Sequence, residues 1–229
     1  MVWLDSYERR ARLIPGLLLV APVAITIVMF GLKDNPVVAW IVGAVATFGG
    51  PVVLANFVRH KGLAVQDSLY ESWGGKPTDQ LLQSGPVAQR DSWRAAVETV
   101  AGKQLPTVGQ VDQGSQYDAA VKVVISKTRA KQFKLVFSEN RNYGYERNLY
   151  GLRNLGRILA GAFLVLSGIA VGLLISVGHR KTRAEWLIGL TALAGLLLLW
   201  TLLPSRERTR TTAFKYAEQL LDAAVELAS

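Results

Sequence analysis

The sequence predicts an all-α membrane protein in which four transmembrane helices form two hairpins that flank a mostly helical cytoplasmic domain. The main observation is that four long apolar stretches contain no charged residue: 13–32, 36–58, 158–178 and 186–204. Each stretch can cross a hydrocarbon core about 30 Å thick at about 1.5 Å of rise per residue. Buried helices of water-soluble proteins usually have shorter apolar runs, so the stretches indicate membrane spans.

The distribution of lysine and arginine predicts the orientation. Four spans place the N-terminus, the middle segment and the C-terminus on one side, where they carry three, fifteen and four basic residues, against four in the two short loops. Because cytoplasmic loops are enriched in basic residues, we expect both termini and the middle segment in the cytoplasm. We expect the protein to be a multi-pass membrane protein with this orientation.

The apolar stretches divide the chain into four parts. These are 1–58 (an amphipathic lead-in and hairpin 1), 59–155 (a basic cytoplasmic domain), 156–204 (hairpin 2) and 205–229 (a cytoplasmic C-terminal helix). The chain has no cysteine, which excludes disulfides and thiol chemistry.

Apolar residues at helical spacing predict helices in the polar segments. The expected ranges are 63–73, 77–83, 87–101, 115–129 and 208–227. Residues 131–138 alternate enough to predict a short strand or an extended segment. A further helix is expected from about residue 145 into the third apolar stretch. We expect the C-terminal helix to pack on the cytoplasmic segment or on a neighbouring subunit.

The second apolar stretch contains a predicted break at Gly49-Gly50-Pro51. Proline removes a backbone donor, and inside a bilayer such a break persists only where protein or water satisfies the freed carbonyl groups. Asn56 follows as the one amide side chain in any span. We expect this segment to act as a hinge.

The third apolar stretch contains a GxxxG pair, Gly168 and Gly172. Small residues at this spacing allow helices to approach closely. They could pack one hairpin on the other, or they could join subunits of a cyclic oligomer around a pore. The candidate pore and hinge residues are therefore Gly49, Gly50, Pro51, Asn56, Gly168 and Gly172.

The composition of the spans argues against several classes of function. No span contains an ionisable residue, and ion-coupled transporters usually need such groups at mid-membrane. A pore remains compatible, because hydrophobic constrictions can gate by dewetting. No catalytic set or metal-ligand cluster is apparent, and we expect neither a cofactor nor enzymatic activity. Gly74-Gly75-Lys76 lacks the spacing of a phosphate loop, so we interpret it as a turn with a surface lysine.

The cytoplasmic segment is basic and rich in aromatic residues near its end. Cations that bind phosphates, together with rings that stack on bases, are the combination used by proteins that hold nucleotides and single strands. Contact with anionic lipid and structural ion pairing are the other two interpretations. The candidate ligand-binding residues are Lys127, Arg129, Lys131, Lys134, Arg141, Tyr143, Tyr145 and Arg147.

Asn, Gly and Tyr crowd the segment 137–148, directly before the third span. Gly144 permits a left-handed turn, and asparagines favour turns and caps. We therefore expect an ordered elbow here, which could also transmit ligand binding to the membrane.

Three segments carry a resemblance to a known group of proteins: Tyr7–Pro15 (YERRARLIP), Ser72–Thr78 (SWGGKPT) and Asn140–Asn148. In size and layout the chain resembles the small multi-pass membrane effectors of bacterial nucleotide-signalled anti-phage defence, in particular the Hailong-type channel subunit. The resemblance implies a homo-oligomer, with a tetramer as one candidate. It also implies a single-stranded DNA oligomer as ligand, made by a partner nucleotidyltransferase, and defence by depolarisation of the bacterial inner (plasma) membrane in which the multi-pass protein lies.

We therefore expect an oligomeric channel whose basic cytoplasmic region senses a nucleotide or oligonucleotide. The alternative is a non-conducting membrane adaptor whose basic domain docks a partner protein or anionic lipid.

Overall fold

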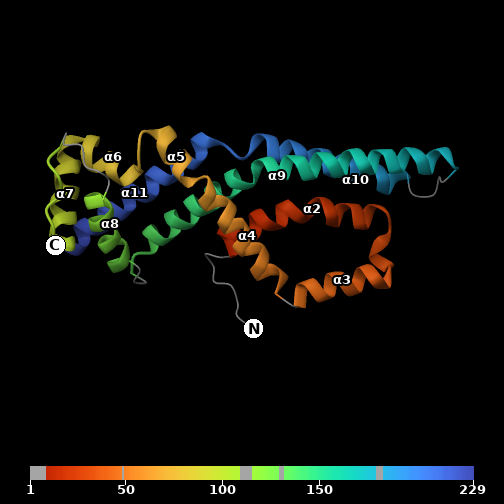
Figure 1. Cartoon of the computed structure of the whole chain (residues 1–229), viewed down its shortest axis with the longest axis horizontal. Coiled ribbons are helices and arrows are strands. Elements are labelled where there is room, and N and C mark those ends of the chain that lie inside the picture. Colours follow the sequence, from red (N-terminus) through yellow and green to blue (C-terminus); the bar gives the residue numbers. More distant parts are fainter. Residues whose placement is uncertain (1–8, 48, 109–114, 129–131, 179–182) are drawn as a thin grey trace. The chain divides into compact units, whose positions relative to one another are not determined.

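A computed structural model describes residues 9–47, 49–108, 115–128, 132–178 and 183–229, and all regular elements among these residues are helices (Figure 1). This confirms the expected all-helical class. The chain forms two compact units. The membrane unit comprises residues 1–65 and 145–205, and the polar unit comprises residues 66–144 and 206–229. The predicted lead-in before residue 9 lies outside the described residues.

The first part of the membrane unit consists of five helical elements. They are η1 (Arg9–Leu13), α2 (Ile14–Met29), η2 (Leu32–Asp34), α3 (Pro36–Thr47) and α4 (Gly50–Ala64). α2 continues through Pro22, an interior proline. The side chain of Asn35 accepts a hydrogen bond from the backbone N–H of Val37 at 2.9 Å, so that asparagine caps α3 as the chain turns back.

The second part of the membrane unit consists of α10 (Arg183–Leu202) and most of α9 (Lys134–Ser176). The two helices meet closely where Gly156 lies under the indole of Trp200, which is fully buried. Arg157 donates hydrogen bonds to the carbonyls of Trp200 and Thr201, each at 3.2 Å. These contacts satisfy two of the free carbonyls at the C-terminal end of α10.

Among the described residues, three helices are long and apolar enough to cross a membrane. They contain α2, the apolar part of α9, and α10. α3 passes the same test only together with the helical stretch Gly50–Ser84, which begins with α4, and the two are bent by 67°. The described residues therefore contain three candidate spans, or four if the bent pair is one broken span.

The bend lies at the predicted break. Gly49 has a φ of +92°, a left-handed conformation that favours glycine, and Gly50 and Pro51 open α4. α3 has no buried residue, and the side chain of Trp40 is 74% exposed. An apolar helix with no buried residue requires lipid or another protein around it.

The polar unit is a helical bundle with its own apolar core. Its helices are α5 (Gln66–Trp73), α6 (Pro77–Ser84), α7 (Val87–Ala101), α8 (Ser115–Lys127), α11 (Arg206–Ala228) and the first turns of α9. Leu82, Trp93, Val124 and Leu221 are among the fully or nearly fully buried residues of the core. The amphipathic α11 packs against α6 and α7.

Two local expectations were wrong. Residues 134–138 are helical rather than extended, because α9 begins at Lys134. The elbow at 137–148 is likewise an uninterrupted part of α9, and Gly144 has no left-handed backbone. Asn148 shows why asparagine occurs in this helical segment: its buried side-chain amide donates a hydrogen bond to the carbonyl of Ala11 at 2.8 Å. The polar residue therefore serves a contact between helices rather than a turn.

Candidate ligand site of the polar unit

A cavity of about 220 Å³ opens on the polar unit between α5, α6, α8, α9 and α11. Three tyrosines line it, Tyr70, Tyr143 and Tyr216, and two lysines, Lys76 and Lys122. Gln66, Thr78 and Asp118 add polar groups to the walls. Apolar rings with a few convergent polar groups are typical of sites for small organic ligands.

The tyrosines form one connected aromatic wall. The rings of Tyr143 and Tyr216 are stacked, with centroids 6.3 Å apart and planes inclined by 8°. The hydroxyl of Tyr143 donates to the hydroxyl of Tyr70 at 3.1 Å. The ring of Tyr70 packs edge-on against Trp73, with centroids 5.8 Å apart. Since each ring is held by another, the wall offers a pre-organised surface for a planar ligand.

Lys76 supplies a cation at the edge of this wall. Its ammonium donates to both carboxylate oxygens of Asp118. Partial burial opposes the charged form, but the hydrogen bond and negative charge of Asp118 outweigh it and raise the pKa of Lys76 above its ordinary value of 10.5. The side chains of Lys76 and Asp118 are 40% and 34% exposed, and such pairs contribute about 0–1 kcal/mol. An anionic ligand can therefore compete with Asp118 for the lysine.

The turn that carries Lys76 has a defined conformation. Gly74 and Gly75 both have positive φ, +87° and +128°, which favours glycine at both positions. The side chain of Gln80 donates to the carbonyls of Trp73 and Gly75 at 3.0 and 2.8 Å. These bonds fix the path from α5 into α6. The lysine interpreted from sequence as a surface residue of a simple turn therefore belongs to the pocket.

Of the predicted ligand residues that the structure describes, one lines this pocket, namely Tyr143. Lys127 donates to the carbonyl of Val100 at 2.8 Å, which satisfies the C-terminal end of α7. Lys134 lies exposed at the start of α9, and Arg141 contacts the hydroxyl of Ser138 at 3.5 Å.

The other predicted ligand residues lie elsewhere. Tyr145 and Arg147 belong to the membrane unit, where Tyr145 packs against its apolar core. Arg129 and Lys131 lie outside the described residues. The single cluster expected from the sequence is therefore divided between the two units.

Among the aromatic and basic residues of the pocket, the prediction missed four: Tyr70, Lys76, Lys122 and Tyr216. Tyr70 and Tyr216 lie far apart in the sequence, so no local sequence pattern connects them. A weak signal existed for Lys76, since two glycines precede it and a helix-starting proline follows.

The predicted pore and hinge residues lie in two environments: at the bend before α4, and at exposed positions on α4 and α9. Gly49, Gly50 and Pro51 form the bend, and a Cβ on Gly50 would collide with the carbonyl of Val45. Asn56 is exposed on α4.

Gly168 and Gly172 are exposed on α9, and a Cβ at either position would meet no atom within 4 Å. Their face therefore packs on no described part of this chain.

The fold and the pocket define a class: an all-helical protein with helices able to span a membrane, and a separate helical unit with a small, basic, aromatic-walled pocket. No protein-family model matches the chain, and comparison with curated proteins and with solved structures finds no significant match.

Proposed function

We propose that this chain is the subunit of an oligomeric membrane channel whose polar unit binds a nucleotide or one end of an oligonucleotide. In this proposal α3 and α4 form one broken span, so that four spans leave both termini and the polar unit in the cytoplasm of a bacterial inner membrane. The excess of basic residues in those segments supports the orientation.

The observation that carries the proposal is the position of Tyr143. It lines the pocket, and it belongs to the same uninterrupted helix, α9, that continues as an apolar membrane span. A ligand that moves Tyr143 therefore acts on a membrane helix without an intervening loop. Helices transmit such displacements because their backbone hydrogen bonds are continuous.

The pocket chemistry favours a nucleotide over a purely aliphatic or purely anionic ligand. Aromatic walls stack on bases, and the lysines Lys76 and Lys122 can bind phosphate. The cavity of about 220 Å³ is smaller than the roughly 300–1,000 Å³ of sites for drug-sized ligands, so in this proposal it holds the base of one nucleotide while the sugar and phosphate lie at its mouth. An oligonucleotide would place one unit in the pocket and the remainder along the surface.

The membrane unit supports a pore between subunits. Gly168 and Gly172 leave an open face on α9, and small residues allow close approach of a neighbouring helix. The apolar spans lack ionisable groups, which suits a hydrophobic gate. In a defence role of the kind implied by the resemblance above, opening would depolarise the membrane of an infected cell.

Expression in bacteria with a potential-sensitive dye tests the channel proposal. We expect the full chain to depolarise the membrane when its ligand state permits opening, and Gly49→Ala to change that effect, because alanine is strained at a φ of +92°. The matched control is Gly43→Ala in α3, where a Cβ meets no atom within 4 Å. A potential that is preserved in intact cells, and in inverted membrane vesicles with and without added nucleotides, would contradict the channel and favour a non-conducting adaptor.

A further inference from the structure

A second cavity, of about 960 Å³, lies entirely within the membrane unit, between α2, α3 and α4. We propose that it is a binding site for an anionic phospholipid of the surrounding membrane, with an acyl chain in the cavity and the phosphate at its mouth. This site goes beyond the proposed channel function and does not depend on the ligand of the polar unit.

The walls of this lipid groove are suited to hydrocarbon. Among the described residues, sixteen line the groove and all are apolar, glycine or proline. They include Leu17 and Val23 from α2, Val42 and Val45 from α3, and Phe57 from α4. α2 contributes lining residues from Ile27 back to the neighbouring Leu13 of η1. Those fourteen steps of helix correspond to about 21 Å, enough for a chain that reaches through one leaflet of about 15 Å.

The fold keeps the groove open instead of filling it. The first turn of α2 rests on α4, where Gly16 lies against Leu54 and Val58. The bend of 67° after α3 then directs α3 away from that contact, and η2 joins α3 back to α2 (Figure 1). Val45 on α3 and Val53 on α4 remain 58% and 69% exposed although they line the cavity. An occupant from outside the chain must cover these side chains.

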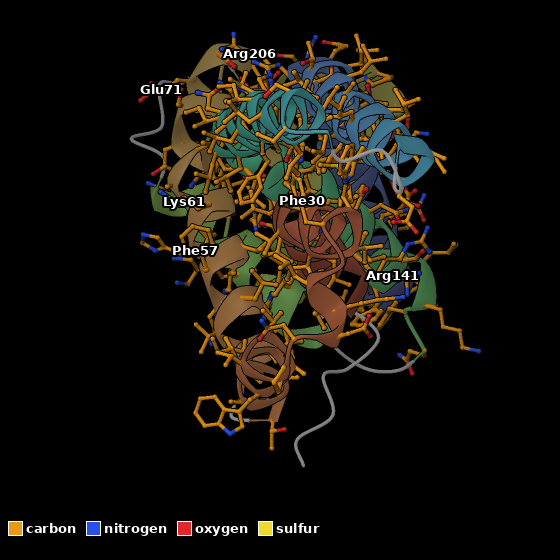
Figure 2. All side chains as sticks on the ribbon, turned by 90° about the vertical axis from the view of Figure 1, so that its right-hand side faces the viewer. Phe30, Phe57, Lys61, Glu71, Arg141 and Arg206 are labelled. Atoms are coloured by element: carbon orange, nitrogen blue, oxygen red, sulfur yellow. The ribbon has the colours of Figure 1, made fainter. Side chains whose placement is uncertain are left out.

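Cations mark one end of the groove. Phe57 lines the cavity, and the ammonium of Lys61 lies 5.6 Å from the centre of its ring, one helical turn further along α4 (Figure 2). Arg10 is exposed and precedes the lining residue Leu13 by three positions in η1, which packs against α4. Along α4, helix spacing places Lys61, four positions after Phe57, on the same face as that lining residue. η1 is a π-helix, and its packing against α4 brings Arg10 to this end of the site. Both cations therefore lie at the same end of the hydrocarbon site.

The apolar groove and the basic residues at its mouth together indicate which kind of molecule binds there. A phospholipid with a negative headgroup complements both parts, because basic residues near the surface attract anionic lipid. A helix from a second copy complements only the apolar part, and in a symmetric pair it would bring a second Arg10 and Lys61 toward the first. Like charges at close distance oppose that arrangement.

Native mass spectrometry of the purified full chain in detergent tests the site, with phosphatidylglycerol and phosphatidylcholine of identical acyl chains as probes. We expect phosphatidylglycerol to bind in preference. Lys61→Gln and Arg10→Gln should each reduce that preference about fivefold, which corresponds to about 1 kcal/mol per cation. The matched control is Arg59→Gln, because Arg59 is exposed on the same helix but two positions from Lys61, and so on a different face.

A second variant tests the hydrocarbon part. Ala44→Trp places an indole in the groove and should weaken binding of both lipids, whereas Ile188→Trp at an exposed position of α10 should not. Equal binding of the two lipids by the unmodified chain, or an unchanged preference in Lys61→Gln and Arg10→Gln, would overturn the proposal. A disulfide-linked dimer of the otherwise cysteine-free chain carrying Ala24→Cys would also overturn it, since a second copy would then occupy the groove.

Discussion

The rings of Tyr143 and Tyr216 lie nearly parallel, 6.3 Å apart between centroids, although 73 positions of sequence separate them, including the apolar part of α9 and all of α10. Tyr143 comes from α9 and Tyr216 from α11. The stack therefore forms only when the C-terminal helix is docked in the polar unit. It is the wall on which the proposed base would rest.

The first prediction concerns this wall. Tyr143→Ala should weaken nucleotide binding by about 1–3 kcal/mol, or about 5- to 150-fold, because one stacking surface is lost. Tyr143→Phe is the matched control: it retains the ring and removes the hydroxyl that donates to Tyr70. Isothermal titration with mononucleotides and short DNA oligomers measures both. Equal affinity of the alanine variant and the unmodified chain would show that the base does not bind here.

The second prediction concerns the two lysines. Lys76→Gln and Lys122→Gln should each weaken binding of a short oligonucleotide and reduce the slope of log K against log salt by about 1, as expected for the loss of one phosphate contact. Lys103→Gln is the control, because Lys103 is exposed in the same unit and does not line the pocket. Fluorescence anisotropy between 50 and 300 mM salt measures the affinity and its salt dependence for each protein. Identical slopes in all four proteins would exclude phosphate binding at this site.

The third prediction concerns pH. Asp118 raises the pKa of Lys76 above 10.5, so the ammonium remains protonated at every pH below that value and its contribution should not change between pH 6 and 9. A terminal phosphate loses its second negative charge below a pKa of about 6. Affinity for a nucleoside monophosphate should therefore decrease below pH 6, whereas affinity for a dinucleotide without a terminal phosphate should stay constant. A decrease in affinity between pH 7 and 9 would contradict this assignment of the cation.

The sequence predicts helices well where the signal is local. The spacing of Trp93, Ala96, Val97 and Val100 predicts a helix over 87–101, and α7 has those bounds. The break at Gly49-Gly50-Pro51 was also predictable, because positive φ and the missing proline donor are properties of those residues themselves.

The pocket could not be predicted in the same way. Three of the predicted ligand residues, Lys127, Arg141 and Tyr145, are close in sequence to Tyr143. They contact other partners because they lie on other helix faces or in the other unit. Composition also misled at 140–148, where Asn and Gly indicated a turn. Asn148 is buried against Ala11, and Gly151 lies against the backbone of Lys61, so tertiary contacts determine these residue types.

The fourth prediction tests the packing of the membrane unit. Gly156→Ala should lower stability by about 1–3 kcal/mol, because its Cβ would overlap the fully buried indole of Trp200. Gly161→Ala, one and a half turns further along α9, should be neutral or slightly stabilising, since a Cβ there meets no atom within 4 Å. Thermal unfolding in detergent compares the two variants. Equal loss of stability in both would show that α9 and α10 do not meet at Gly156.

The central claim is that a nucleotide in the pocket of the polar unit controls permeability of the membrane unit. Ion flux through proteoliposomes that contain the purified full chain tests it most directly, with mononucleotides and short DNA oligomers added on the side of the polar unit. We predict a flux that changes on addition of nucleotide, and a loss of that response in Tyr143→Ala but not in Tyr143→Phe. Vesicles that stay impermeable, or a flux that is the same with and without nucleotide, would contradict the account.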